Sequence, residues 1–450
     1  MSALRILDIS PARILIGSFL FVILAGTFLL SLPVSRLVDM HLIDLFFTAT
    51  TSTCVTGLFT VPMSYFSFFG QCVILALIQI GGLGLMTLSI FLVSLVLNLS
   101  LTTKFLAGQI LDFAFSGKLK TFLKTIIGFT IFTEIIGALI LYKSFIKILP
   151  RDKAIFYSIF HSVSAFCNSG ASLFEPGISN LAQDSLSLLT MAVLIFLGGI
   201  GFIVWYEAVS NLVNYIKNWW NEEPKKLTMS LHTKIVLITS STLIFLGSLL
   251  FFILERTNTL AGLSTWHQIV NSIFISVTAR TAGFENVDMS NLGLPILLIL
   301  IILMFIGASS SSTGGGVKVT TFTVFVATIA ATIRGKNNVE IFGRTISPEQ
   351  IFKTTAIIAL SLSFVLATTF ILLITDPEFS FMQILFEAVS AFATVGLSTG
   401  ITPYFSIFGK IVLMLAMLLG RVGALTLVLA LRKGQETQLY KYPEERVLLG

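Results

Sequence analysis

Long apolar runs, most of them near the length of a membrane helix, alternate along this chain with short apolar runs that end in a polar, glycine-containing stretch. A helix needs ~20 apolar residues to cross a bilayer. The order predicts a spanning helix, a shorter re-entrant helix with its loop, and a second spanning helix, four times over. The first helices are expected at 13–32, 124–145, 235–254 and 355–375, the re-entrant helices at 41–52, 153–166, 265–278 and 382–392, and the second helices at 68–97, 187–214, 294–334 and 408–431.

This order predicts an all-α polytopic membrane protein with eight transmembrane helices, built as four helix–pore loop–helix repeats around a pseudo-fourfold pore. The repeats are expected at 1–100, 101–217, 218–335 and 336–431, and a C-terminal tail at 432–450. The composition agrees, with 55% hydrophobic residues and a mean hydropathy of +0.95. The three cysteines fit neither a disulfide framework nor a metal site.

The distribution of basic residues predicts the orientation. Of the 28 lysines and arginines, 18 fall on the side of the two termini and 7 on the other. Positive loops stay in the cytoplasm. We therefore expect a multi-pass protein of the cell (plasma) membrane with both termini cytoplasmic, and we attribute the net charge of +6 to these loops, not to nucleic-acid binding.

Four glycines mark a candidate ion filter. Gly57, Gly170, Gly283 and Gly396 are 113 residues apart in each case, and each ends a short apolar stretch. Backbone carbonyls around one axis can replace the hydration shell of a cation. The expected K⁺ ligands are the two residues before each glycine together with the glycine itself: Val55, Thr56 and Gly57; Asn168, Ser169 and Gly170; Thr281, Ala282 and Gly283; Thr394, Val395 and Gly396. The alternative is that these glycines only turn the chain between helices.

Other residues at membrane depth need partners. Arg280 precedes the third filter segment, and we expect its side chain to point behind the filter, toward acids or carbonyls. Glu134 and Glu387 are candidates to pair with basic groups, because an unpaired acid at this depth is costly. Each needs a partner or water, and the sequence leaves open which pairs form. A second set of glycines, Gly81, Gly198, Gly307 and Gly420, follows the filter glycines by 24 to 28 residues and supports the repeat.

A run of small and polar residues interrupts the second helix of the third repeat. It reads Gly307, Ala308, Ser309, Ser310, Ser311, Ser312, Thr313, Gly314, Gly315 and Gly316. Such a run does not hold a stable helix, and irregular backbone at this depth is tolerated only beside water or within protein. We interpret 307–316 as a gating loop beneath the filter. The alternative is close packing of small residues between helices.

Arg421 lies well inside the last predicted helix. An arginine at this depth indicates a functional site. Facing the axis, it would form an electrostatic barrier and hydrogen-bond the loop, so we assign it to the gate. The alternative is snorkelling to the cytoplasmic interface, which we favour for Lys318.

Five segments together resemble the Trk/Ktr/HKT superfamily of potassium transporters, and most closely its KtrB-type members. They are 160–170 (FHSVSAFCNSG), 198–207 (GGIGFIVWYE), 280–284 (RTAGF), 312–322 (STGGGVKVTTF) and 386–397 (FEAVSAFATVGL). The resemblance implies a potassium-translocating subunit that forms a homodimer in the lipid bilayer with one pore per protomer. It also implies a cytosolic ring of KtrA-like RCK regulatory subunits, which bind ATP or ADP, and an intramembrane gating loop at 307–316.

The resemblance also bears on selectivity. Glycine in all four filter segments is typical of potassium-preferring members, and Gly57 keeps that pattern. Sodium is a candidate second ion. At 309–312 the loop has four serines where many relatives have another glycine, which bears on its flexibility.

Two other function classes fit less well. A secondary carrier for an organic substrate predicts inverted repeats, whereas these repeats share one orientation. An enzyme is not expected, because the chain has neither a GxxxxGK[ST] phosphate loop nor an HExxH motif, and its four histidines are scattered.

Overall fold

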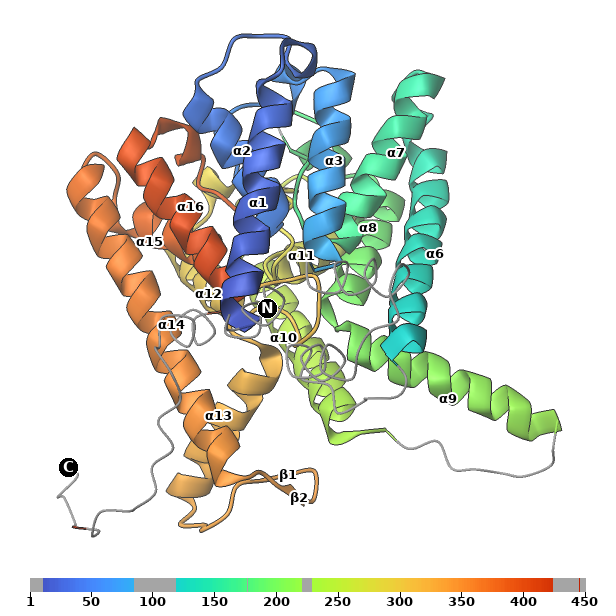
Figure 1. Ribbon diagram of the computed structural model, residues 1–450, viewed down its shortest axis with the longest axis vertical. Coiled ribbons are helices and arrows are strands. Elements are labelled where there is room, and N and C mark those ends of the chain that lie inside the picture. Colours follow the sequence, from blue (N-terminus) through green and yellow to red (C-terminus); the bar gives the residue numbers. More distant parts are fainter. Residues whose placement is uncertain (1–10, 85–118, 176, 221–228, 424–444, 446–450) are drawn as a thin grey trace, which may run out of the picture.

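Helices make up most of the described chain, because a backbone surrounded by lipid must satisfy its own hydrogen bonds. The computed structural model describes residues 11–84, 119–175, 177–220, 229–423 and 445 (Figure 1). The first helices of the four repeats are α1 (Pro11–Ser31), α6 (Leu119–Phe145), α10 (Leu231–Glu255) and α14 (Pro348–Thr375). The short helices are α2 (Leu42–Cys54), α7 (Arg151–Phe166), α11 (Thr265–Thr278) and α15 (Phe381–Phe392).

The second helices complete the four repeats. They are α3 (Phe68–Gly82), α8 (Ser185–Gly199) with α9 (Phe202–Trp220), α12 (Leu294–Phe305) with α13 (Val319–Ile333), and α16 (Ile407–Val422). The predicted interruption of the third repeat therefore lies between α12 and α13. The predicted extensions to residues 97 and 431, and most of the tail at 432–450, lie outside the described residues. A two-stranded antiparallel hairpin that the sequence did not predict, β1 (Glu340–Ile341) with β2 (Arg344–Thr345), follows α13.

The surface of the helices fits a membrane. Within the described residues, α6, α10 and α14 are long and apolar enough to span a bilayer, and α8 with α9 forms a bent pair. Large apolar side chains are exposed around the helices, including Phe21, Phe28, Phe132, Phe245 and Phe370. The chain is thus a multi-pass membrane protein, and the number of eight crossings stays a prediction.

One predicted helix is wrong. The sequence suggested a continuous helix at 187–214, but α8 and α9 meet at an angle of 94°. Gly201 has a φ of +94° at the break, a conformation that glycine adopts without steric cost. The Trp205 indole nitrogen, Nε1, donates to the Leu197 carbonyl at 2.8 Å, which satisfies a group that the break leaves free. As a result, α9 extends sideways from the bundle (Figure 1).

The repeats pack in a closed order. α3 contacts α7, α8 contacts α11, α12 contacts α15, and α16 returns to contact α2. An ion pair reinforces the closure between the fourth and first repeats, because Lys410 Nζ lies 2.9 Å from Asp44 Oδ1 and both side chains are largely buried.

We expect Lys410→Met to destabilise the protein by about 3 kcal/mol, because it leaves the Asp44 carboxylate buried without its partner. Thermal unfolding of the detergent-solubilised chain measures this. Lys353→Met is the matched control: Lys353 pairs with Glu349 at 2.7 Å, but both side chains are exposed, and such pairs contribute little. Equal melting temperatures for the two variants would contradict the assigned role of the pair.

Candidate functional site

The four predicted filter segments share one unusual backbone conformation. Two residues before each glycine, a non-glycine residue lies in the left-handed region: Val55 at φ 57°, Asn168 at 59°, Thr281 at 73° and Thr394 at 51°. The glycines themselves are at φ +97°, +69°, +76° and +97°. A non-glycine residue with positive φ is uncommon, and its strain persists only where the surroundings impose it. Four occurrences at equivalent positions therefore identify one structure built four times.

The segments also meet each other in a ring. A Cβ added at any of these glycines would come closer than 3.0 Å to the carbonyl oxygen that precedes the glycine of the next segment. Gly57 faces the Ser169 oxygen in this way, Gly170 faces Ala282, Gly283 faces Val395, and Gly396 returns to Thr56. Each glycine thus lets the neighbouring carbonyl approach, and the ring closes without a gap.

The short helices anchor this ring through their hydroxyl groups. The Gly57 nitrogen donates to Thr51 Oγ1 at 3.0 Å, and the Gly396 nitrogen donates to Ser390 Oγ at 3.0 Å. In the second segment the Ser164 hydroxyl donates to the Ala171 carbonyl at 2.8 Å. These three hydroxyl residues lie six positions before their glycines. The third segment departs from the pattern, since Thr278 accepts from the Phe284 nitrogen at 2.7 Å.

A hollow of about 260 Å³ opens on one side of the ring. All four filter glycines line it, and so do the carboxylate residues Glu175 and Glu285. Glu285 accepts from the Ser398 nitrogen at 2.9 Å, and Glu175 accepts from the Ser64 nitrogen at 3.2 Å, so each acid bridges two repeats. Carboxylates at the mouth of a cleft raise the local concentration of cations. Neither acid was predicted from the sequence, although each follows its filter glycine within five residues.

Loop 307–316 packs against the ring away from this hollow. A Cβ at Gly314 would collide with Thr281 Oγ1, and one at Gly315 would collide with Thr394 Oγ1. Both threonines are among the four residues of the ring that have a positive φ. The loop therefore lies directly against two of the four segments, close enough that only glycine fits.

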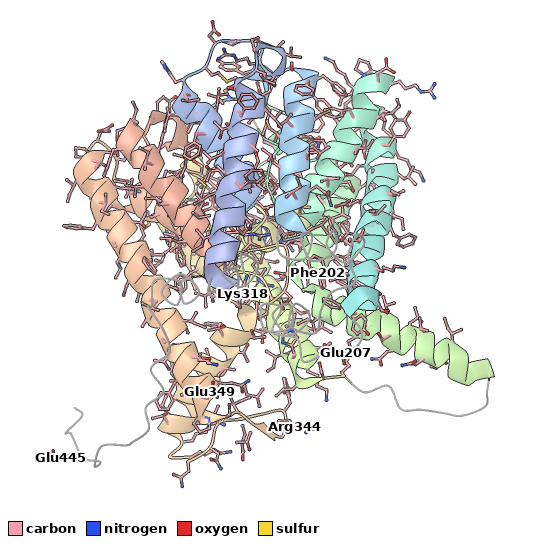
Figure 2. All side chains as sticks on the ribbon, viewed as in Figure 1. Phe202, Glu207, Lys318, Arg344, Glu349 and Glu445 are labelled. Atoms are coloured by element: carbon pink, nitrogen blue, oxygen red, sulfur yellow. The ribbon has the colours of Figure 1, made fainter. Side chains whose placement is uncertain are left out.

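Three basic residues reach this region. Arg421 donates from Nη1 to the Thr313 carbonyl of the loop and from Nη2 to the Gly81 carbonyl of α3. The predicted hydrogen bond from Arg421 to the loop is confirmed. For Lys318 the sequence favoured snorkelling, which is wrong, because its Nζ donates to the Gly314 carbonyl at 2.8 Å. Figure 2 shows Lys318 near the middle of the view, where α13 begins.

Arg280 behaves as predicted. Its guanidinium donates to the Ser240 carbonyl, to Ser240 Oγ at 3.2 Å, and to the Gly307 carbonyl at 3.3 Å. It thus lies behind the third segment and holds the start of the loop.

Glu134 and Glu387 were candidates to pair with basic groups, and their partners were left open. Within the described residues neither Glu134 nor Glu387 has a lysine or arginine within ion-pair distance. Glu387 instead accepts from the hydroxyls of Ser398 and Thr402 at 2.6 and 2.8 Å and from the Thr399 nitrogen at 2.9 Å. Glu134 Oε1 lies 3.9 Å from Cys167 Sγ. Hydroxyl and amide donors satisfy Glu387 in place of a charge.

The second set of glycines supports the short helices. A Cβ at Gly81 would collide with the Thr53 carbonyl, one at Gly198 with the Phe166 carbonyl, and one at Gly420 with the Phe392 carbonyl. Each of these carbonyls lies four residues before a filter glycine. Gly307 is the exception, since it packs on Gly315 within the loop.

Comparison with known proteins agrees with this geometry. The family model TrkH, described as a cation transport protein, matches residues 11–440. This chain belongs to that family. Among its TrkH-family relatives, the Ktr system potassium uptake protein B of Vibrio alginolyticus is 39% identical over 97% of this chain and 94% of the relative. The protein of the same name from Bacillus subtilis is 36% identical over 98% of this chain and 97% of the relative.

Two further matches bear on the fold and the ions. The crystal structure of the potassium transporter TrkH from Vibrio parahaemolyticus superposes with a TM-score of 0.71, covering 92% of this chain and 84% of that one at 17% identity. This likeness confirms the TrkH fold. A relative from Enterococcus hirae, 36% identical over 98% of both chains, is named potassium/sodium uptake protein NtpJ. The chain is therefore a TrkH-family membrane transporter and not an enzyme.

Proposed function

We propose that this chain is the potassium-translocating pore subunit of a Ktr-type uptake system. One observation carries the proposal: the four filter segments form a closed ring of backbone carbonyls with the same left-handed conformation at equivalent positions. Such a ring can replace the water around a monovalent cation without a full charge that would trap it. The ligands would be the carbonyls of the filter residues named above, and the hollow with Glu175 and Glu285 would be the ion's entrance.

We further propose that loop 307–316 and Arg421 form the gate. The loop packs against the ring, and Arg421 ties it to α3, so this arrangement would block the ion path. A cytosolic KtrA-like RCK ring that binds ATP or ADP would control the loop, and the subunit would act as a homodimer in the plasma membrane with both termini cytoplasmic. The full-length similarity to Ktr system proteins supports this assembly. The name of the NtpJ relative supports sodium as a second ion.

Gly57→Ser is expected to lower the preference for K⁺ over Na⁺ about tenfold. The serine Cβ would collide with the Ser169 carbonyl at a residue with φ +97°, so the first and second segments must separate. A loosened ring no longer holds carbonyls at the distance that suits potassium. Rubidium uptake into liposomes that contain the full chain, with sodium as competitor, measures the change.

The same substitution in an open position is the control. Gly17 lies on α1 in the same repeat, and a Cβ there meets nothing within 4 Å. Gly17→Ser should keep wild-type selectivity. If Gly57→Ser also left the competition by sodium unchanged, the filter assignment would be refuted.

A further inference from the structure

Loop 307–316 is bonded to the bend between α8 and α9 through its backbone. The Ser309 nitrogen donates to the Gly199 carbonyl at 3.0 Å, and the Thr313 nitrogen donates to the Gly198 carbonyl at 3.3 Å. In the other direction, the Phe202 nitrogen donates to the Ser311 carbonyl at 2.8 Å. The bend and the loop, which come from different repeats, are thus joined on both sides of the break.

The shape of the bend makes this contact close. A Cβ at Gly201 would lie 2.6 Å from the Ser310 carbonyl oxygen. Gly201 therefore allows the loop to rest on the turn between the two helices. The 94° angle between α8 and α9 positions the first amide of α9 to face the loop.

The beginning of α9 is also tied to other helices. The Glu207 carboxylate accepts from the Ser230 nitrogen at 2.6 Å and from the Ser230 hydroxyl at 2.7 Å, at the N-terminus of α10. Trp205 stacks on Phe129 of α6 with ring centroids 4.0 Å apart. Beyond Glu207, α9 leaves the bundle (Figure 1), and Leu212, Val213 and Tyr215 are exposed. Figure 2 shows Phe202 and Glu207 where this arm begins.

We propose that α9 is a lever that holds the loop against the ring, so that displacement of the projecting part of α9 by a cytosolic partner releases the loop. The pivot is the bend at Gly199–Phe202, and the coupling bond is the one from the Phe202 nitrogen to the Ser311 carbonyl. This inference rests on the proposed function, in which the loop is the gate. It adds the element through which regulation reaches that gate.

One pair of substitutions isolates the coupling bond. Phe202 is the first residue of α9, where proline is tolerated because its amide has no partner within the helix. Phe202→Pro removes the donor to Ser311, and Phe202→Ala removes the same buried ring but keeps the donor. We expect Phe202→Pro to take up rubidium about fivefold faster than Phe202→Ala in liposomes that contain the full chain alone. Loss of one backbone hydrogen bond changes the ratio of released to held loop about fivefold.

A second variant and a second readout distinguish release of the loop from misfolding of the chain. Gly201→Ala should also raise uptake, because its Cβ pushes on the Ser310 carbonyl. Gly262 has a comparable φ of +87°, but a Cβ there meets nothing within 4 Å. Gly262→Ala should therefore leave uptake unchanged. In a Ser312→Cys background, Phe202→Pro should speed modification of the new cysteine by a soluble thiol reagent relative to Phe202→Ala.

The outcomes separate the two proposals. If deletion of 309–313 raises uptake but Phe202→Pro matches Phe202→Ala in both uptake and thiol modification, the lever is refuted and the gate stands. If no variant, including the deletion, gives measurable rubidium uptake, the proposed function fails and the lever fails with it. Faster uptake and faster modification in Phe202→Pro than in Phe202→Ala support the lever.

Discussion

Replacing Gly396 with alanine is expected to reduce rubidium uptake about a hundredfold. The new Cβ would collide with the Thr56 carbonyl, which is backbone and cannot swing aside, at a residue with φ +97°. The left-handed conformation costs an alanine roughly 1–2 kcal/mol, and crowding in a well-packed region costs about 1–3 kcal/mol more. Because the segments touch in order around the ring, the fourth cannot move without moving the first. Uptake by liposomes reconstituted with the full chain measures the loss.

Gly400 provides the matched control for this prediction. It lies four residues further along the same segment, has a φ of +86° and also lines the hollow, but a Cβ there meets nothing within 4 Å. Gly400→Ala therefore imposes a similar backbone strain without a collision in the ring, and it should keep most of the uptake. Wild-type rates for both variants would show that the ring at Gly396 is not the conduit, whereas equal losses would attribute the effect to backbone strain.

The position of the filter could be predicted because it depends on local sequence repeated four times. The equal spacing of Gly57, Gly170, Gly283 and Gly396 located the four segments, and the preceding apolar stretches located α2, α7, α11 and α15 to within a few residues. The loop between α12 and α13 was predictable for the same reason, since ten small or polar residues cannot continue a helix. These features follow from local backbone preferences.

The partners of individual side chains could not be predicted, because they depend on how each loop folds back on its own helix. Glu387 was a candidate to pair with a base, but its hydrogen bonds come from hydroxyls and an amide that follow it in the same repeat. Lys318 was expected to snorkel, but the folded loop places the Gly314 carbonyl within its reach. In both cases a nearby polar group satisfied the buried charge, and an apolar pattern contains no sign of such a group.

The bend between α8 and α9 shows a different limit. The motif at Gly198–Gly201 was noted as a landmark of the repeat but not interpreted as the end of a helix, although Gly201 and Gly423, at equivalent positions, share a φ of +94°. The turn is held by contacts from another repeat, above all those of Ser309, Ser311 and Thr313. Tertiary contacts therefore override a continuous apolar pattern at this point.

Deleting 309–313 is expected to raise rubidium uptake by the full chain alone at least about tenfold. The deletion removes both loop amides that donate to the α8–α9 bend and the Thr313 carbonyl that accepts from Arg421. Without these bonds the remaining glycines have little to hold them against Thr281 and Thr394, so the path through the ring opens. Ser310→Ala is the control, because it removes only a hydroxyl contact with Thr320 at 3.2 Å and should leave uptake unchanged.

Arg421→Ala tests the same gate by removing the arginine that anchors the loop. It removes one anchor of the loop but leaves the three backbone bonds to the bend, so uptake should fall between those of the wild type and the deletion. It also removes a positive charge beside the proposed ion path, which lowers the electrostatic barrier to a cation. If the deletion left uptake at the wild-type level while Arg421→Ala raised it, the barrier would be the charge of the arginine, and the loop would serve only to position it.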